Sequence, residues 1–155
     1  MVGTMTPSAV QDAFVTISVD LAAAVRKTEN GFFTGLPESE VLESADRYLK
    51  FLTLIQRYPH TALAPTRDID EMWHAHMLHP VAYYHDCIAN FGRIIDHDGG
   101  FGMEEHEVPV LAATFEHTAE LWEKEFSEEY APGDGRGVKC KRDCVNRCWH
   151  ACKSK

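Results

Sequence analysis

The chain has 155 residues, of which 45% are hydrophobic and 25% are charged, and its net charge is −9. This length suits one domain with a substantial core, and the ordinary composition excludes a disordered or fibrous class. The charge is uneven, because residues 1–131 carry 8 basic and 22 acidic side chains, whereas residues 132–155 carry 7 and 2. An acidic body argues against a nucleic-acid partner, since phosphate contacts need a basic face.

The first 25 residues show no targeting or membrane segment. They hold no basic run ahead of an apolar stretch, and Gln11, Asp12 and Asp20 interrupt their apolar residues. Only Cys87 of the five cysteines lies in the body, which is not the distribution of a disulfide-stapled secreted domain. We therefore expect no membrane contact and a cytoplasmic location.

Apolar residues recur at helical spacing along most of the chain, and no period-two segment of useful length appears. This pattern predicts an all-α fold, a single compact bundle of about five helices plus a short C-terminal Cys-containing helix or flexible tail. Residues 1–131 would form the helical domain, residues 132–138 a Gly-rich hinge and residues 139–155 a basic Cys-rich tail.

The first two helices are predicted from apolar stripes. One follows Thr6-Pro7-Ser8 and ends near residues 29–31, with a stripe made of Val10, Phe14, Ile17, Leu21 and Val25. The second runs from Leu36-Pro37 to about Tyr58-Pro59, with a stripe made of Val41, Ala45, Tyr48, Leu52 and Ile55. The same pattern places Arg47 on another face of that helix.

Capping signals define the remaining helices. Thr66 or Asp68 is a credible N-cap for a third helix that ends near Leu78. Pro80 suits the first position of a fourth helix, which would end at Gly92. A fifth helix is predicted over residues 108–126, with a buried stripe made of Leu111, Phe115, Thr118, Trp122 and Phe126.

The most informative part of the chain is a histidine-rich segment, DIDEMWHAHMLHPVAYYHDC, which FGRIIDHD follows closely. Five of the nine histidines fall within 24 residues of one another: His74, His76, His79, His85 and His97. Imidazole is a usual ligand for zinc, iron or copper, and carboxylates complete or orient such sites. The competing interpretation is a set of core histidines that hydrogen-bond to carboxylates or carbonyls.

Helix geometry limits which of these side chains share a face. Asp70 and His74 are one turn apart on the same face, whereas His74 and His76 lie about 200° apart on an ideal helix. Those two histidines would therefore bind one ion only if the helix ended or distorted near Ala75. The segment lacks HExxH, so a zinc-protease site has no support.

The run YLKFLTLIQRYPHTALAPTRDIDEMWHAHMLHPVAYYHDCIANFGRIIDHD resembles the glycine-rich domain-containing protein family. Its members carry PTxDIDxxWHxHMLxPxxYxxDC followed by FGRxxDHD, and the match covers about Tyr48 to Asp98. His79 and His85 fall at variable positions of that pattern. The resemblance implies a compact helical domain and names no reaction. The chain departs from plant members in being short and in carrying a Cys-containing tail where they have a glycine-rich extension.

Together, the pattern and the resemblance predict a metal centre of Asp70, His74, His76 and His97, with the DHD loop returning His97 to the third helix. The expected ion is a divalent transition metal (zinc, iron or copper). Asp86, Asp98 and Tyr83 are predicted to support these ligands from behind.

The tail places Cys140, Cys144, Cys148 and Cys152 four residues apart, which on a helix gives one thiol stripe. Thiols in a line of about 18 Å cannot surround one zinc ion. The stripe suits the apolar side of a docking helix, a soft-metal ligand set, a redox sensor or an oligomerisation handle. A protein partner or self-association through the tail is a further expectation.

Three functions are therefore open: a metal-binding protein with or without metal-dependent enzyme activity, a non-enzymatic scaffold or interaction module with a buried His/Asp network, and a metal-handling protein that uses the Cys tail. No nucleophile elbow, phosphate loop or dinucleotide fingerprint offers another chemistry.

Overall fold

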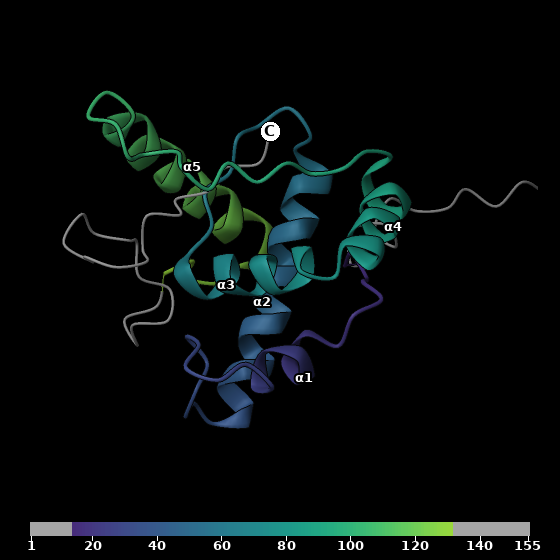
Figure 1. Ribbon diagram of the computed structural model, residues 1–155. Helices are drawn as coiled ribbons and strands as arrows, with labels where there is room; N and C mark the ends of the chain where they lie inside the picture. Colours follow the sequence, from purple (N-terminus) through teal and green to yellow (C-terminus); the bar gives the residue numbers. More distant parts are fainter. Residues whose placement is uncertain (1–13, 132–155) are drawn as a thin grey trace, which may run out of the picture.

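The computed structural model describes residues 14–131, which contain five α-helices in chain order (Figure 1). They are α1 (Leu21–Arg26), α2 (Glu38–Arg57), α3 (Arg67–Met77), α4 (Pro80–Phe91) and α5 (Val108–Phe126). The predicted all-α fold is confirmed. The predicted hinge and the thiol tail lie outside the described residues. Among the helices described, none is long and apolar enough to cross a membrane.

The predicted first helix is wrong in its extent. Residues 14–20 are not helical, and the helix proper spans only Leu21–Arg26. The cause is competition from distant side chains: Val15 N donates to Thr53 Oγ1 at 3.0 Å, and Ser18 N donates to the Asp86 carboxylate at 3.0 Å. Asp20 then caps α1 by accepting from Ala23 N.

The other four helices agree closely with the sequence-based prediction. Pro80 occupies the first turn of α4, and Gly92 ends that helix with a φ of 71°, a left-handed conformation that glycine adopts freely. In α5 the second half is buried through Thr118, Leu121 and Trp122, whereas the first half extends away from the body (Figure 1). The early part of the predicted α5 stripe is accordingly only half-buried.

The core lies where α3 crosses α2 and where α1 covers both (Figure 1). From α2 it takes Tyr48, Phe51, Leu52, Leu54 and Ile55, and from α3 it takes Ile69, Met72 and Trp73, all of them 2% exposed or less. The ring centroids of Phe51 and Trp73 are 5.5 Å apart. Because α3 is held on this apolar side, its polar side chains emerge at the two edges of the contact.

A buried ion pair joins three parts of the chain. Arg47 is 6% exposed, contrary to the sequence pattern, and its Nε donates to Asp68 Oδ2 at 2.7 Å. Its Nη2 donates to Thr66 Oγ1 and to the carbonyl of Tyr130. Arg47 therefore connects α2, the start of α3 and the segment after α5, and it is the ion pair with Asp68 that makes burial of this cation tolerable.

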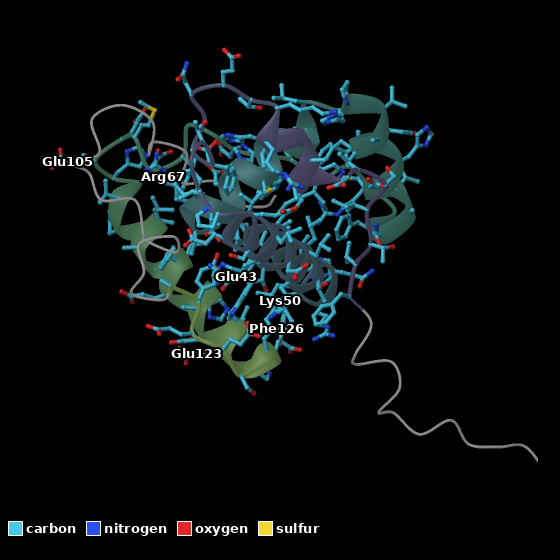
Figure 2. The ribbon with its side chains drawn as sticks, turned by 90° about the horizontal axis from the view of Figure 1, so that it is seen from below. Glu43, Lys50, Arg67, Glu105, Glu123 and Phe126 are labelled. Atoms are coloured by element: carbon cyan, nitrogen blue, oxygen red, sulfur yellow. The ribbon has the colours of Figure 1, made fainter. Side chains whose placement is uncertain are left out.

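A surface contact fastens the end of α5 to α2. Lys50 Nζ lies 5.7 Å from the ring centroid of Phe126 and pairs with Glu128 at 2.6 Å (Figure 2). Both groups are partly exposed, so we expect this pair to contribute much less to stability than the buried one.

We expect Arg47→Ala to lower the free energy of unfolding by about 3–5 kcal/mol, because it leaves the buried Asp68 carboxylate without its cation. The matched control is Arg26→Ala, which removes the more exposed pair with Glu38 and is expected to cost below about 1 kcal/mol. Urea unfolding followed by circular dichroism measures both variants. Equal losses would contradict the role assigned to Arg47.

Candidate metal centre

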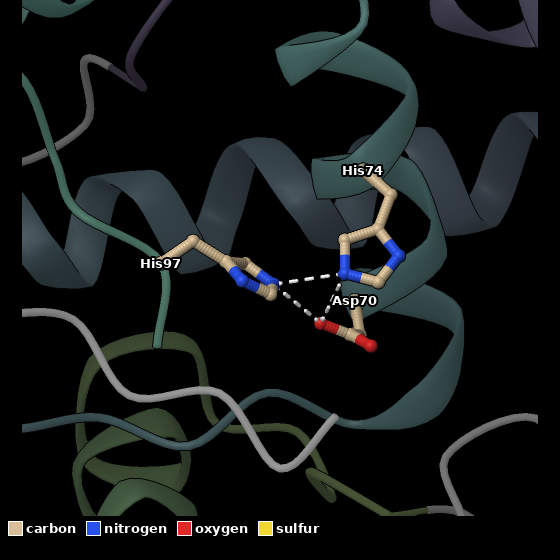
Figure 3. A group of neighbouring side chains, drawn as sticks. All are labelled: Asp70, His74 and His97. Carbon is tan, nitrogen blue, oxygen red and sulfur yellow. Dashed lines mark hydrogen bonds and ion pairs between the residues drawn. The ribbon is translucent and has the colours of Figure 1, made fainter. Parts of the chain in front are cut away.

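One edge of α3 carries Asp70 and His74, which lie one turn apart and point the same way (Figure 3). Asp70 is held in the first turn by the bond from its own amide to the carbonyl of Thr66. The buried residues Ile69, Met72 and Trp73 fix the roll of α3, so the Asp70 and His74 side chains project beside the core and not into it.

His97 approaches these two side chains from the segment after α4. Its Nε2 lies 2.9 Å from Asp70 Oδ1 and 3.0 Å from His74 Nε2, and His74 Nε2 lies 3.5 Å from the same carboxylate oxygen (Figure 3). The side chains of Asp70 and His97 are 8% and 6% exposed, whereas that of His74 is 29% exposed. Among residues 14–131, this group has the spacing of a metal-ligand set.

The distances fit a transition-metal ion. The three atoms form a triangle with sides of 2.9, 3.0 and 3.5 Å. A point that lies about 2.0–2.1 Å from every corner, the usual distance from zinc to nitrogen or oxygen, exists about 0.9 Å outside the plane of this triangle. All three ligands then stand on one side of the point, and the opposite side stays open for other ligands.

Proton placement leaves acceptor atoms facing this point. A carboxylate oxygen only accepts hydrogen bonds, and two imidazole N–H groups that faced each other at 3.0 Å would repel. Without an ion, at most one of the two Nε2 atoms can therefore carry a proton toward this point. The group thus presents a carboxylate charge and at least one nitrogen lone pair to a single small volume.

Tyr83 sets the position of His97 indirectly, through hydrogen bonds to Trp73 and to the backbone of Ile95. Its hydroxyl accepts from Trp73 Nε1 at 2.9 Å and donates to the carbonyl of Ile95 at 2.5 Å. The Trp73 ring meets His97 edge to face, with centroids 4.7 Å apart. The segment that carries His97 is therefore tied to α3 and α4 two residues before the ligand. Burial raises the pKa of Tyr83, which keeps this hydroxyl protonated.

His76, predicted as a ligand, does not join the group. Because α3 stays regular through Ala75, His76 points to the other edge, where it is 1% exposed. Its Nδ1 lies 2.9 Å from the Tyr48 hydroxyl and its Nε2 lies 2.9 Å from Asp86 Oδ2. Asp86 accepts only, so Nε2 carries the proton and Nδ1 accepts from Tyr48. Burial lowers the pKa of His76 and outweighs the opposing effect of Asp86.

Asp86 accordingly supports His76 and not the candidate ligand group of Asp70, His74 and His97. It also accepts from the amide and the hydroxyl of Ser18, which holds the non-helical segment before α1. Sequence reasoning missed Ser18, since 68 positions separate it from Asp86 and no pattern links them. Asp98 follows His97 at the start of a turn and is outside the ligand group. His79 and His85, disfavoured by the sequence, are exposed on the surface.

The model of the family "Glycine-rich domain-containing protein-like" matches residues 4–86. The chain belongs to this family. Two relatives from Arabidopsis thaliana, Glycine-rich domain-containing protein 1 and Glycine-rich domain-containing protein 2, are 31% and 30% identical to it over 121 residues. Each match covers 72% of this chain but only 14% and 15% of the relative, so the chain spans about one seventh of their length. No solved structure matches the chain.

We expect Tyr83→Phe to destabilise the fold by about 1–3 kcal/mol, because it leaves the Trp73 N–H and the Ile95 carbonyl buried without a partner. Amide hydrogen exchange should accelerate at residues 95–97. The matched control is Tyr84→Phe, since Tyr84 is 48% exposed, and its effect should stay within about 0.5 kcal/mol. Unchanged exchange in Tyr83→Phe would contradict the positioning role of this hydroxyl.

Cys87 lies beside Tyr83 among the buried residues of α4, and burial raises the pKa of its thiol. A raised pKa leaves less thiolate at pH 8, so we expect Cys87 to be alkylated by iodoacetamide far more slowly in the folded chain than in urea. Mass spectrometry of the peptide that contains Cys87 measures this ratio. Equal rates in the two states would show that the thiol is accessible.

Proposed function

We propose that this chain is a metal-binding helical protein whose centre is Asp70, His74 and His97, and that the bound ion acts on a substrate. The observation that carries the proposal is the convergence of one carboxylate oxygen and two imidazole nitrogens within 3.5 Å of one another. Three ligands from two separate parts of the chain meet there, on a rigid helix and on a segment fastened by Tyr83.

The donor set favours a divalent transition metal. Two imidazoles and one carboxylate suit zinc, iron or copper, and sites with three protein ligands of this kind keep open positions for water, oxygen or substrate. Such an ion would supply Lewis acidity or an activated water molecule. The low exposure of Asp70 supports the proposal, because a buried carboxylate needs a cation or several hydrogen bonds to remain charged.

Each neighbour has a definite part in this proposal. The Trp73 ring, which packs edge to face with His97, shields the imidazole from water on the core side. His74 is the most exposed of the three ligands, so solvent and substrate would reach the ion past its ring. Tyr83 would keep the loop ligand in place while the ion is exchanged.

The second candidate is a scaffold in which the same polar residues only hold the helices together. A hydrogen-bonded network of the Tyr48, His76, Asp86 and Ser18 side chains favours the scaffold candidate. Each of these side chains has a hydrogen-bond partner within the network. That network explains His76 and Asp86 but gives no reason for two further imidazoles to face each other beside a carboxylate. Metal handling by the Cys tail is a third candidate, and it lies outside the described residues.

The test is titration of the tag-free chain with Co²⁺, followed by calorimetry. The four tail cysteines are changed to serine so that thiolates do not bind the ion. We expect one ion per chain, and a gain of about 2.7 kcal/mol in unfolding free energy at a free ion concentration a hundred times the Kd. Asp70→Asn, His74→Gln and His97→Gln should each weaken binding by at least about a hundredfold, more than loss of a supporting residue does.

The double variant His79→Gln/His85→Gln is the matched control, because both histidines are exposed and lie in the same segment. It should bind Co²⁺ like the parent chain. If the parent binds no ion, or if the control loses binding as fully as the ligand variants, the metal proposal fails and the scaffold candidate takes its place.

A further inference from the structure

An open groove runs along the first half of α5, beside the connector between α2 and α3. Its volume is about 690 Å³, and its surface is mostly apolar. The connector contributes residues 60–62, and α5 contributes Pro109, Val110, Ala113, Thr114 and His117. None of the three candidate metal ligands lines this groove, so it is separate from the metal centre.

The groove side of α5 is exposed within residues 14–131. Val110 is 50% exposed, and Pro109, Ala113 and His117 are exposed as well. A helix of a globular protein normally buries its apolar side, as the second half of α5 does through Trp122. The first half, which extends away from the body, instead presents an apolar surface of the kind that receives another segment of chain (Figure 1).

The described chain ends close to this groove. Tyr130, the last residue but one, donates to the carbonyl of Ala64 at 2.7 Å, and its ring centroid lies 5.3 Å from that of Phe115 on α5. Ala64 N in turn donates to Thr118 Oγ1 at 3.0 Å, one residue past the end of the groove. Residues 132–155 follow. A hinge of seven residues spans up to about 23 Å when extended, so the Cys-rich tail is long enough to reach the groove.

The Cys-rich tail and the border of the groove carry opposite charges. Residues 139–155 hold six basic side chains and one acidic side chain. On α5, Glu116 and Glu120 are exposed, and each lies three residues beyond a residue that lines the groove, so both border it on the helix surface. Glu105 is exposed just before the same helix (Figure 2). A basic segment is therefore attracted to this side of the molecule.

We propose that the Cys-rich tail, residues 139–155, docks in this groove of its own chain. The Trp149 indole would lie on the apolar wall, and the lysines and arginines of the tail would lie beside Glu116 and Glu120. Trp149 is the only aromatic residue of the tail, and an indole ring buries a large apolar area. The proposal is independent of the metal centre, because the two sites share no residue.

The exposed apolar side chains of α4 are the alternative docking surface. Val81, Tyr84 and Ile88 are 71%, 48% and 41% exposed. They belong to a helix on the opposite side of the molecule from α5 (Figure 1). The one carboxylate of α4, Asp86, already accepts hydrogen bonds from other groups. The surface of α4 therefore lacks both the nearby chain end and the negative charge that favour the groove.

The test is an NMR measurement on the full, reduced chain with ¹³C-labelled alanine methyl groups. We expect nuclear Overhauser effects between the Trp149 indole protons and the methyl groups of Ala62 and Ala113, which line the groove. The indole signals are assigned from their loss in Trp149→Ala. A mixture of labelled and unlabelled chains identifies the occupant. Contacts between different chains would show the tail of a second copy in the groove and would overturn docking within one chain.

Trypsin cleavage after Arg147, followed by mass spectrometry, gives the second readout. Ala113→Gln fills the groove with a polar side chain, and we expect it to accelerate this cleavage about tenfold or more. The matched control is Ala89→Gln, the same change at an exposed alanine of α4, which should leave the rate unchanged. Both variants should unfold within about 0.5 kcal/mol of the parent, since each change lies on a helix surface.

The charges of the groove border are tested separately. Glu116→Gln/Glu120→Gln should accelerate cleavage after Arg147 about threefold, the effect of losing two exposed ion pairs. An unchanged rate in this variant would refute the electrostatic part of the proposal. Equal rates in Ala113→Gln and the parent, or indole contacts to α4 in place of the groove, would overturn the docking site while leaving the metal proposal intact.

Discussion

The Tyr83 hydroxyl makes the two hydrogen bonds on which the candidate site depends. It accepts from Trp73 on α3 and donates to the backbone just before His97, so one oxygen atom joins a core helix, α4 and the returning loop. Removal of that oxygen would leave the fold its apolar core but would free the loop ligand. The precision of the site therefore comes from a neutral, buried hydroxyl and not from the ligands themselves, which only meet at the end of this support.

The candidate site also depends on the regular geometry of α3. A helix that is apolar along one side and polar at both edges can serve two purposes, because positions two apart point in nearly opposite directions. One edge of α3 brings Asp70 and His74 toward His97, and the other buries His76 between Tyr48 and Asp86. The network around His76 also reaches Ser18, which fastens the segment before α1. The candidate metal group and the packing of the N-terminal segment are thus attached to the same eleven residues.

Much of this arrangement follows from local rules, and the remainder does not. Helical spacing, Pro80 and Gly92 predicted α2 to α5 to within a residue or two, and the same spacing put Asp70 and His74 on one face. The family resemblance suggested the return of His97. Three features had tertiary causes: the unwound residues 14–20, the burial of Arg47 and the pairing of His76 with Asp86. Their partners lie 10 to 83 positions away along the chain, where periodicity carries no information.

The opposite directions of His74 and His76 have a consequence for the interpretation of related sequences. A relative that keeps the WHxH run but lacks a histidine after its fourth helix would retain the imidazole that packs the core and lose the one that completes the ligand set. The family match itself ends at residue 86, ahead of His97. Assignment of a metal centre across homologues therefore requires inspection of the DHD loop, because the histidine pair on α3 does not by itself indicate the ligand set.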